Sequence, residues 1–305
     1  MKTPIVSKNV FEVISRFRSS PFIVVEPGGN YGDYLIYQGT YKLFKLAGIS
    51  YKKVNFEEFM RLEIKPNEII YINGGGGLND WWGEWAVNTF IKAVRSKSFA
   101  VIVGPSSVVN DPDYLNRKLF KDASAANKKV FLFCRENYSS MILKNIIPGK
   151  FELLTDHDAA LNLDHEDVLK TVSRGYYTLY AIRDDKERHE AIKKCLPFAL
   201  WLDPIPHAKS MEEWVSLHTY AKKIFTNRLH SSILGSILNK PTVLLSNNYH
   251  KNRAVWEYSL KQRNVIWKDS LESPVLSLLM KSGLYKRMVN SYKIDKFTKR
   301  ICLHE

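Results

Sequence analysis

The chain has 305 residues, 45% hydrophobic and 25% charged, which is about two domains' worth and excludes both a single small module and a disordered chain. No apolar run approaches the length of a membrane-spanning helix, and we expect no signal peptide; three scattered cysteines, without the spacing of a disulfide framework, favour the cytoplasm. The net charge of +14 indicates a protein that attracts anions, such as nucleic acid, acidic membranes, or phosphorylated and carboxylated small molecules.

Short β-rich apolar runs alternate with helical patterns along the chain, which is typical of α/β units around a mainly parallel sheet. In the first half we expect strands at Phe22–Glu26, Tyr51–Val54, Glu68–Ile72, Phe99–Gly104, Val130–Cys134 and Phe151–Thr155. Helices are predicted between them at Tyr34–Ala47, Trp81–Arg95, Tyr114–Ala123 and Ser139–Ile147.

The second half repeats this alternation. Its strands are predicted at Tyr176–Ile182, Lys223–Thr226, Thr242–Leu245 and Val265–Trp267, and its helices at Met211–Tyr220, Arg228–Leu238 and Arg253–Arg263. The polar stretch Leu163–Gly175 is the predicted boundary between residues 1–165 and 166–305. We therefore expect two doubly wound, Rossmann-like domains facing each other across a cleft, with ligands at the carboxyl ends of the strands.

Glycine-rich segments follow two of the predicted strands. The first is Gly28-Gly29-Asn30-Tyr31-Gly32-Asp33, where backbone N–H groups at a helix start favour an anion. Asp33 is alternatively the N-cap of that helix, and the whole segment a structural turn. The second is a four-glycine turn after Ile72 that includes Gly75 and Gly76. Such a run indicates a close approach of backbone to a ligand or to the neighbouring domain.

Aromatic and cationic side chains follow the same strand ends. Trp81 and Trp82 come directly after the glycine run and suit the stacking of a sugar ring, although Trp82 and Trp85 also have the spacing of a core helix face. Arg135 follows an apolar strand, where a guanidinium can bind a carboxylate or phosphate, or form a salt bridge to a neighbouring glutamate.

The sharpest motif is Thr226-Asn227-Arg228-Leu229-His230, after the predicted strand ending at Thr226. With Thr226 or Asn227 as N-cap, Arg228 and His230 lie in the first helical turn, at the positive end of the helix dipole. A histidine at a helix start is usually structural, but a fixed charge beside a titratable imidazole makes an anion site with an acid–base group. Lys251, in the equivalent position after the next strand, adds a cation. Metal-ligand pairs such as HxxxH are absent from the sequence, so we expect no metal.

Taken in order, these motifs resemble the polysaccharide pyruvyl transferase family. The resemblance runs from Phe22 to Val265 and rests on GGNYGD, the glycine run, CREN, TDHDAAL, TNRLHSSILGSILNKPTVLLS and the following Lys251. The RLH motif at its helix start, preceded by GGNYGD, is the most specific part. One departure from the family is Asn227, where an aspartate often stands, which puts the pKa of the neighbouring histidine in question.

The resemblance implies a fold similar to the two-domain glycosyltransferases of the B type. The implied activity is transfer of the enolpyruvyl unit of phosphoenolpyruvate onto two hydroxyls of a sugar in a polysaccharide or its precursor, which forms a pyruvate ketal and releases phosphate. The implied general acid–base is His230, no cofactor is needed, and the N-terminal domain takes the acceptor. The donor-binding residues that it implies are Arg135, Arg228, Leu229 and Lys251.

Other functions fit parts of the sequence. A nucleotide-sugar-dependent glycosyltransferase would use the same architecture, but the second half has no convincing acid to hold a ribose. The positive charge suits a nucleic-acid-binding module, but it is spread along the chain and no recognised reading motif is present, so we expect no nucleic-acid partner. A degenerate, non-catalytic partner in glycan assembly is a further alternative. From residue 281 to 305, seven basic residues stand against two acidic ones, which favours either a solvated helix or contact with an anionic membrane that carries a lipid-linked acceptor.

Overall fold

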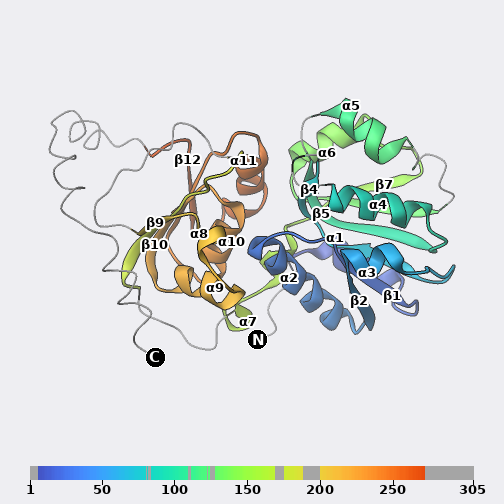
Figure 1. The fold of residues 1–305 in the computed structure, drawn as a ribbon, viewed down its shortest axis with the longest axis horizontal. Coiled ribbons are helices and arrows are strands. Elements are labelled where there is room, and N and C mark those ends of the chain that lie inside the picture. Colours follow the sequence, from blue (N-terminus) through green and yellow to red (C-terminus); the bar gives the residue numbers. More distant parts are fainter. Residues whose placement is uncertain are drawn as a thin grey trace.

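The computed structural model describes residues 6–79, 81, 84–108, 111–121, 123, 128–168, 175–187 and 200–271. Within these ranges the predicted alternation of strands and helices builds two parallel sheets (Figure 1). Trp82 and the basic segment 281–305 lie outside the described residues. Among the helices in the described ranges, none combines the length and the apolar character that crossing a bilayer requires.

The first sheet is built from the N-terminal half of the chain, and all its pairings are parallel. Its order is β2 (Tyr51–Asn55), β1 (Phe22–Glu26), β3 (Ile69–Ile72), β5 (Ala100–Val108), β6 (Lys129–Cys134) and β7 (Phe151–Thr155), with β4 (Gly75–Leu78) paired to β5. In β1, Ile23 and Val25 join one apolar cluster while Phe22 and Val24 join another. This alternation follows from the two-residue period of a strand, so the sheet has a core on each face.

Helices cover both faces of the first sheet. One face packs against α1 (Lys8–Arg16) and α2 (Tyr31–Ala47). The other packs against α3 (Phe56–Arg61), α4 (Trp85–Arg95), α5 (Pro112–Leu115), the π-helical turn η1 (Asn116–Phe120) and α6 (Asn137–Lys144). Because water is excluded on both sides, strands β3 and β5 are buried along their whole length.

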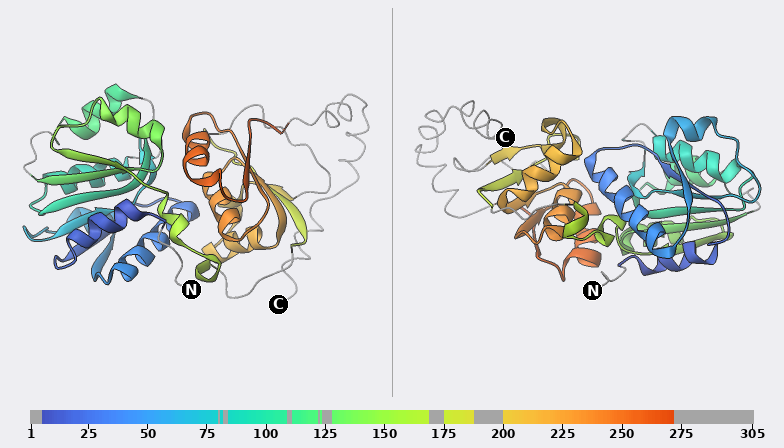
Figure 2. Two further views of the ribbon diagram at one scale, coloured as in Figure 1. Left: turned by 180° about the vertical axis from the view of Figure 1, so that it is seen from behind. Right: turned by 90° about the horizontal axis from the view of Figure 1, so that it is seen from below.

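The second sheet comes from the C-terminal half and is also parallel. Its order is β12 (Val265–Lys268), β11 (Thr242–Leu245), β10 (Ala221–Thr226), β8 (Tyr177–Ala181) and β9 (Leu200–Leu202). The helices beside it are α8 (Pro204–His207), α9 (Met211–Thr219), α10 (Leu229–Ile237), α11 (Lys251–Val255) and the π-helical turn η4 (Trp256–Leu260). The chain passes between the two halves through the 3₁₀ turn η3 (Ala159–Asn162) and α7 (His165–Val168). Figure 2 shows the sheets from behind and from below, each with its own helices.

Each sheet has one point at which the order of its strands reverses. In the first sheet the chain starts at β1, adds β2 on one side, and then places β3 and all later strands on the other side. In the second sheet β8, β9 and β10 repeat this arrangement. Both sheets are therefore doubly wound and Rossmann-like, with reversal points between β1 and β3 and between β8 and β10.

One apolar cluster is shared by the two halves. It contains Leu35 and Ile36 of α2, Ala160 of η3, Trp214 of α9 and Ile233 of α10, all buried. Helix α2, which leaves the first sheet at β1, therefore packs directly against the helix that leaves the second sheet at β10. This contact sets the starts of α2 and α10 beside each other.

The structure confirms the predicted strands Phe22–Glu26, Phe151–Thr155 and Thr242–Leu245 to the residue. Several boundaries differ. The helix expected from Tyr34 begins at Tyr31, and the one expected from Trp81 begins at Trp85.

Four helices and two strands are not in the sequence prediction. The helices are α1, α3, α7 and α8, and the strands are β4 and β9. The prediction of a four-glycine turn after Ile72 is wrong, because Gly75–Leu78 forms strand β4, which pairs with β5. Glycine is disfavoured in strands, so the pairing with β5 outweighs the local preference of these residues.

Leu35 in the shared cluster provides a test of this packing. Replacing Leu35 by alanine should destabilise the fold by about 2–5 kcal/mol, because the side chain is buried and leaves a cavity between α2 and η3. Leu46→Ala on the exposed face of the same helix should change stability by less than about 0.5 kcal/mol. Urea unfolding of the two variants and the wild type measures both effects, and equal losses would contradict the shared cluster.

Candidate active site

One pocket of about 520 Å³ is lined by loops from both sheets. The first sheet contributes the loop between β1 and α2 and the glycines of β4, and the second contributes the loops after β8 and β10. These loops flank the two reversal points, where doubly wound sheets bind their ligands. The charged or titratable side chains that line the pocket are Asp33, Arg135, Arg183, Asp185, Glu187, Arg228, His230 and Lys251.

The loop after β1 turns at Gly29, whose φ of 141° is accessible almost only to glycine. Asn30 caps α2, since its Oδ1 accepts the Gly32 N–H at 2.8 Å. The Asn30 N–H in turn donates to Asp33 Oδ2 at 2.9 Å and completes a capping box. The alternative in which Asp33 is the N-cap is therefore wrong, because Asp33 is the third residue of the helix. Gly29, Asn30 and Asp33 all line the pocket.

The glycine run comes close to the same loop. A side chain at Gly76 would approach Arg135 Nη2 to 3.4 Å and Lys251 Nζ to 3.8 Å, so backbone and cations face each other here. Gly76 lines the main pocket, whereas Gly75 lines a smaller cavity beside it, next to Asp33. The sequence left open whether the run approaches a ligand or the neighbouring domain. In the structure it borders a pocket and also lies against side chains of both halves.

Arg135, the residue after β6, is buried in the pocket wall with 1% of its surface exposed. Its Nε donates to Ser107 Oγ at 2.8 Å and its Nη1 donates to Asp158 Oδ2 at 2.9 Å. The salt bridge that the sequence analysis weighed for this residue therefore exists, with an aspartate 23 residues away instead of a neighbouring glutamate. The Nη2 atom of the same guanidinium faces Gly76 of β4.

His230 lies in the first turn of α10, and the same carboxylate faces it. Its Nε2 is 3.5 Å from Asp158 Oδ2, and the Asp158 side chain is fully buried. Burial acts to raise the pKa of Asp158, but His230 and Arg135 outweigh it and hold that pKa well below its usual range. The sequence analysis did not single out Asp158. The TDHDAAL motif, which contains Asp158, was the available sequence signal, but nothing in that motif indicates that Asp158 contacts Arg135 and His230.

The start of α10 differs from the prediction by one residue. Neither Thr226 nor Asn227 is the N-cap, because Arg228 occupies that position. Thr226 Oγ1 nevertheless accepts the Arg228 N–H at 2.9 Å, and Asn227 Oδ1 accepts the Arg183 N–H at 2.8 Å. The amide of Asn227 thus fixes the chain where it leaves β8. The acid that faces His230 comes from the first half of the chain.

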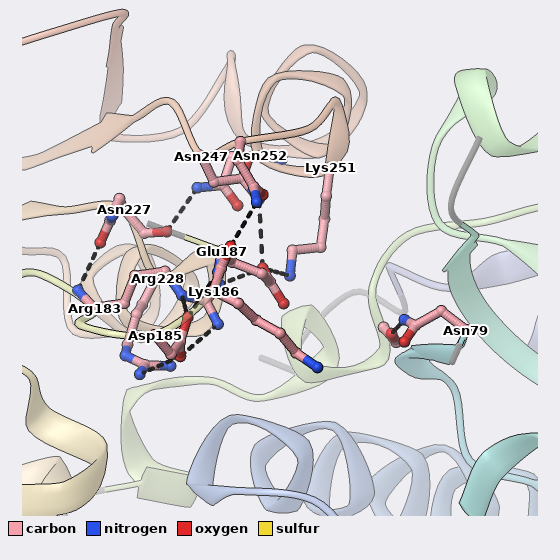
Figure 3. A network of polar contacts seen from close by, with 12 residues as sticks. Asn79, Arg183, Asp185, Lys186, Glu187, Asn227, Arg228, Asn247, Lys251 and Asn252 are labelled. Atoms are coloured by element: carbon pink, nitrogen blue, oxygen red, sulfur yellow. Dashed lines mark hydrogen bonds and ion pairs between the residues drawn. The ribbon is translucent and has the colours of Figure 1, made fainter. Parts of the chain in front are cut away.

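Arg228 is bound by carboxylates of the second half. Its Nε donates to Asp203 Oδ1 at 2.6 Å and its Nη2 donates to Asp203 Oδ2, a bidentate pair, while Nη2 also contacts Asp185 at 3.1 Å. Asp185 in turn accepts two hydrogen bonds from Arg183, which also pairs with Glu187 (Figure 3). Two arginines and three acids therefore form one network at the second reversal point.

Lys251, the first residue of α11, is buried and donates to Glu187 Oε2 at 2.6 Å (Figure 3). Burial is the largest influence on its ammonium and lowers its pKa to about 8, with Arg183 and Arg135 acting in the same direction and Glu187 opposing them. The pKa of Glu187 lies below its usual value, because Lys251 and Arg183 outweigh the effect of its burial. Lys251 thus lies close enough to Arg183 and Arg135 for both charges to act on its ammonium.

Apolar and aromatic residues complete the lining. Leu229 is 4% exposed and belongs to the cluster shared by the two halves, so it supports the pocket wall. Trp81 lines the pocket and packs edge-on against Tyr249 at 5.2 Å, and its carbonyl oxygen accepts a hydrogen bond from Lys186. Trp85, whose spacing from Trp82 also fitted a core helix face, is 49% exposed and lines the pocket.

The donor set of the pocket is unlike that of a metal site. In the part of the chain that the structure describes, no group of three or more His, Cys, Asp or Glu side chains has the arrangement of metal ligands. Of the carboxylates that line the pocket, Asp185 and Glu187 are instead bound to arginine and lysine. The arrangement suits a ligand with several negative charges and a reaction that moves protons.

Comparison with known proteins gives a consistent result. Residues 30–249 match the family model described as polysaccharide pyruvyl transferase. The Bacillus subtilis (strain 168) protein named "Putative pyruvyl transferase EpsO" is 23% identical in an alignment 271 residues long, which covers 73% of this chain and 80% of that protein. An uncharacterised protein of Klebsiella pneumoniae subsp. pneumoniae NTUH-K2044 has a similar crystal structure, with a TM-score of 0.61, 24% identity, and coverage of 86% of this chain and 97% of that one. A UDP-GlcNAc 2-epimerase of Neisseria meningitidis matches with a TM-score of 0.38, too low to support any inference.

The environment of Lys251 predicts an unusual titration. Its ammonium should lose its proton near pH 8, well below exposed lysines at about 10.4. NMR of the full chain after reductive ¹³C-methylation of its lysines measures this, with Lys251→Arg to assign the signal. Glu187→Gln should move the midpoint further down, because the attractive carboxylate is lost. A Lys251 signal that titrates together with the exposed lysines would contradict this description of the pocket.

Proposed function

Because the chain belongs to the polysaccharide pyruvyl transferase family, we propose that it transfers the enolpyruvyl unit of phosphoenolpyruvate onto two hydroxyls of a sugar, forming a pyruvate ketal and releasing phosphate. The observation that supports this best is that two residues lining the pocket, Arg135 and His230, face one buried carboxylate, that of Asp158. The proposal includes two Rossmann-like halves that face each other across this pocket, as in B-type glycosyltransferases.

The donor carries about three negative charges near neutral pH, from its carboxylate and its phosphate. Among the cations of the pocket, Arg135 and Lys251 have their nitrogens nearest to the bare backbone of Gly76. These two therefore bind the donor's anionic groups in our proposal. Arg228, which the sequence analysis also assigned to the donor, is already paired with Asp203 and Asp185. In our proposal Arg228, with Leu229 beside it, contributes charge and shape to the wall of the pocket that the second half forms.

The proposed chemistry needs one group that gives and takes protons. Protonation of the donor's methylene carbon by His230 makes the adjacent carbon electrophilic, and the first sugar hydroxyl adds there and returns a proton to His230. Loss of phosphate and addition of the second hydroxyl then close the ketal, and the second hydroxyl proton leaves with the phosphate. The electron pair of the broken C–O bond stays with the phosphate, so atoms and charges balance.

The acceptor in this proposal is a sugar of a polysaccharide or of a lipid-linked precursor, bound against the first half. The aromatic faces of Trp81 and Trp85 at the pocket edge suit a sugar ring. The scattered cysteines favour action in the cytoplasm, and the basic segment from residue 281 to 305 favours contact with the anionic inner face of a membrane.

A ligand screen tests the donor class without an acceptor. Excess phosphoenolpyruvate should raise the melting temperature, because a ligand at about 100 times its Kd stabilises the fold by about 2.7 kcal/mol. Parallel samples contain inorganic phosphate and nucleotide-diphosphate sugars. Arg135→Ala should abolish the rise, whereas Arg253→Ala, at an exposed arginine paired with Glu257, should keep it. A rise with a nucleotide sugar and none with phosphoenolpyruvate would support a glycosyltransferase instead.

A catalytic role for His230 is tested by its alanine variant. His230→Ala should lower kcat by about 100- to 10,000-fold, because general acid–base help is lost, while phosphoenolpyruvate still raises the melting temperature. Phosphate release in the presence of a sugar acceptor measures the rate. The matched control is His165→Ala, a partly exposed histidine of α7 outside the pocket lining. Full activity of His230→Ala would remove this residue from the mechanism.

A further inference from the structure

The carboxylate of Asp158 contacts both Arg135 and His230. Its Oδ2 accepts a hydrogen bond from Arg135 Nη1 at 2.9 Å and lies 3.5 Å from His230 Nε2. Its Oδ1 accepts the Ala160 N–H at 3.0 Å, which caps the turn η3. The carboxylate is thus fixed by its own backbone turn, and it meets a histidine from the other half of the chain.

The two nitrogens of His230 have different surroundings. Nε2 is buried on the side of Asp158. Nδ1 lies over Gly32 at the start of α2, so close that a side chain added at Gly32 would approach it to 2.3 Å. Gly32 and His230 both line the pocket. The Nδ1 edge of the ring therefore faces the backbone of Gly32 in the pocket wall, a contact that is possible only because Gly32 has no side chain.

We propose that Asp158 is the positioning residue for His230: it binds the Nε2–H and fixes the tautomer, which leaves Nδ1 as the nitrogen that exchanges protons during the reaction. The identity of that substrate rests on the proposed pyruvyl transfer, but the tautomer and its support do not. The histidine–carboxylate arrangement follows the logic of a base oriented by a buried acid. A separation of 3.5 Å is consistent with such a pair before substrate binding, when catalytic hydrogen bonds are often long.

Several charged groups act on this ring besides Asp158. Arg135 lies behind the shared carboxylate, and Asp33 is on the helix turn that carries Gly32. The other charged groups of the same pocket are Arg183, Asp185, Glu187, Arg228 and Lys251. Most of the latter are paired with one another, so the change of charge at Asp158 is the one His230 senses most directly.

NMR of the free, full-length protein tests the inference without any activity. In the wild type, ¹⁵N shifts of His230 should show the neutral ring protonated at Nε2, with His230→Gln to assign the signal. Asp158→Asn should abolish the preference for the Nε2–H tautomer, because the amide nitrogen that takes the place of Oδ2 is a donor and cannot accept this proton. Asparagine still accepts the Ala160 N–H, so the turn η3 is preserved.

The matched control is Asp156→Asn in the same loop. Asp156 is also buried, but the hydrogen bonds of its carboxylate come from the backbone N–H groups of Val10 and His157 and not from Arg135 or His230. This variant should leave the His230 tautomer unchanged. A wild-type ring protonated at Nδ1, or a ring that stays protonated at Nε2 in Asp158→Asn, would overturn the proposal.

Gly32→Ala is an independent variant that tests the contact at Nδ1. Gly32 lies in α2, where alanine suits the helix, but the added carbon would come to 2.3 Å from Nδ1 and 2.7 Å from Cβ of His230, so the ring has to move. The tautomer preference should then be lost and kcat should fall by at least tenfold. Gly149→Ala, where no atom lies within 4 Å of the added carbon, is the control. A Gly32→Ala protein with the wild-type tautomer and rate would refute the role of Nδ1.

Activity then separates this inference from the proposed function. With phosphoenolpyruvate and a sugar acceptor, Asp158→Asn should lower kcat more than it changes KM. If the wild type transfers no pyruvyl group, the proposed function fails while the NMR result on Asp158 stands. If it transfers normally and the NMR outcome is negative, only the positioning role fails.

Discussion

A carboxylate without access to water has to be ionised and fully paired or else protonated, and Asp158 meets this constraint with groups from two parts of the chain. Arg135 comes from the end of β6 and His230 from the start of α10. Satisfying one buried charge therefore sets a cation and an imidazole side by side. The shared apolar cluster of α2, η3 and α10 keeps water out of this contact.

Charge compensation shapes the rest of the pocket. Arg228 is paired with Asp203 and Asp185, and Lys251 is paired with Glu187. Pairs of this kind add little net stability relative to apolar residues, but removing one partner costs about 3–5 kcal/mol because a buried charge is left alone. Their effect is therefore geometric: the network orients the cations while limiting the net positive charge of the wall.

The two reversal points explain why these residues meet. Each doubly wound sheet opens its loops at one place, and packing of α2 against α10 brings the two places together. The loop after β1 then offers a capped helix start and bare glycine backbone, while the loops after β8 and β10 offer cations and acids. Neither half contains this combination by itself.

The sequence alone determined the elements and most of the site. Apolar runs such as Val130–Cys134 specify strands buried on both faces, and the strand–RLH–helix order places His230 at a strand end, because side-chain periodicity is local. Only the tertiary structure decided what these groups touch. Asp158 and His230 are far apart in sequence, β4 forms from glycines only because β5 is there to pair with, and Arg228 is already neutralised by Asp203. The partner of a buried charge depends on how helices from different halves of the chain pack together, and no local sequence pattern encodes which residues this packing brings into contact.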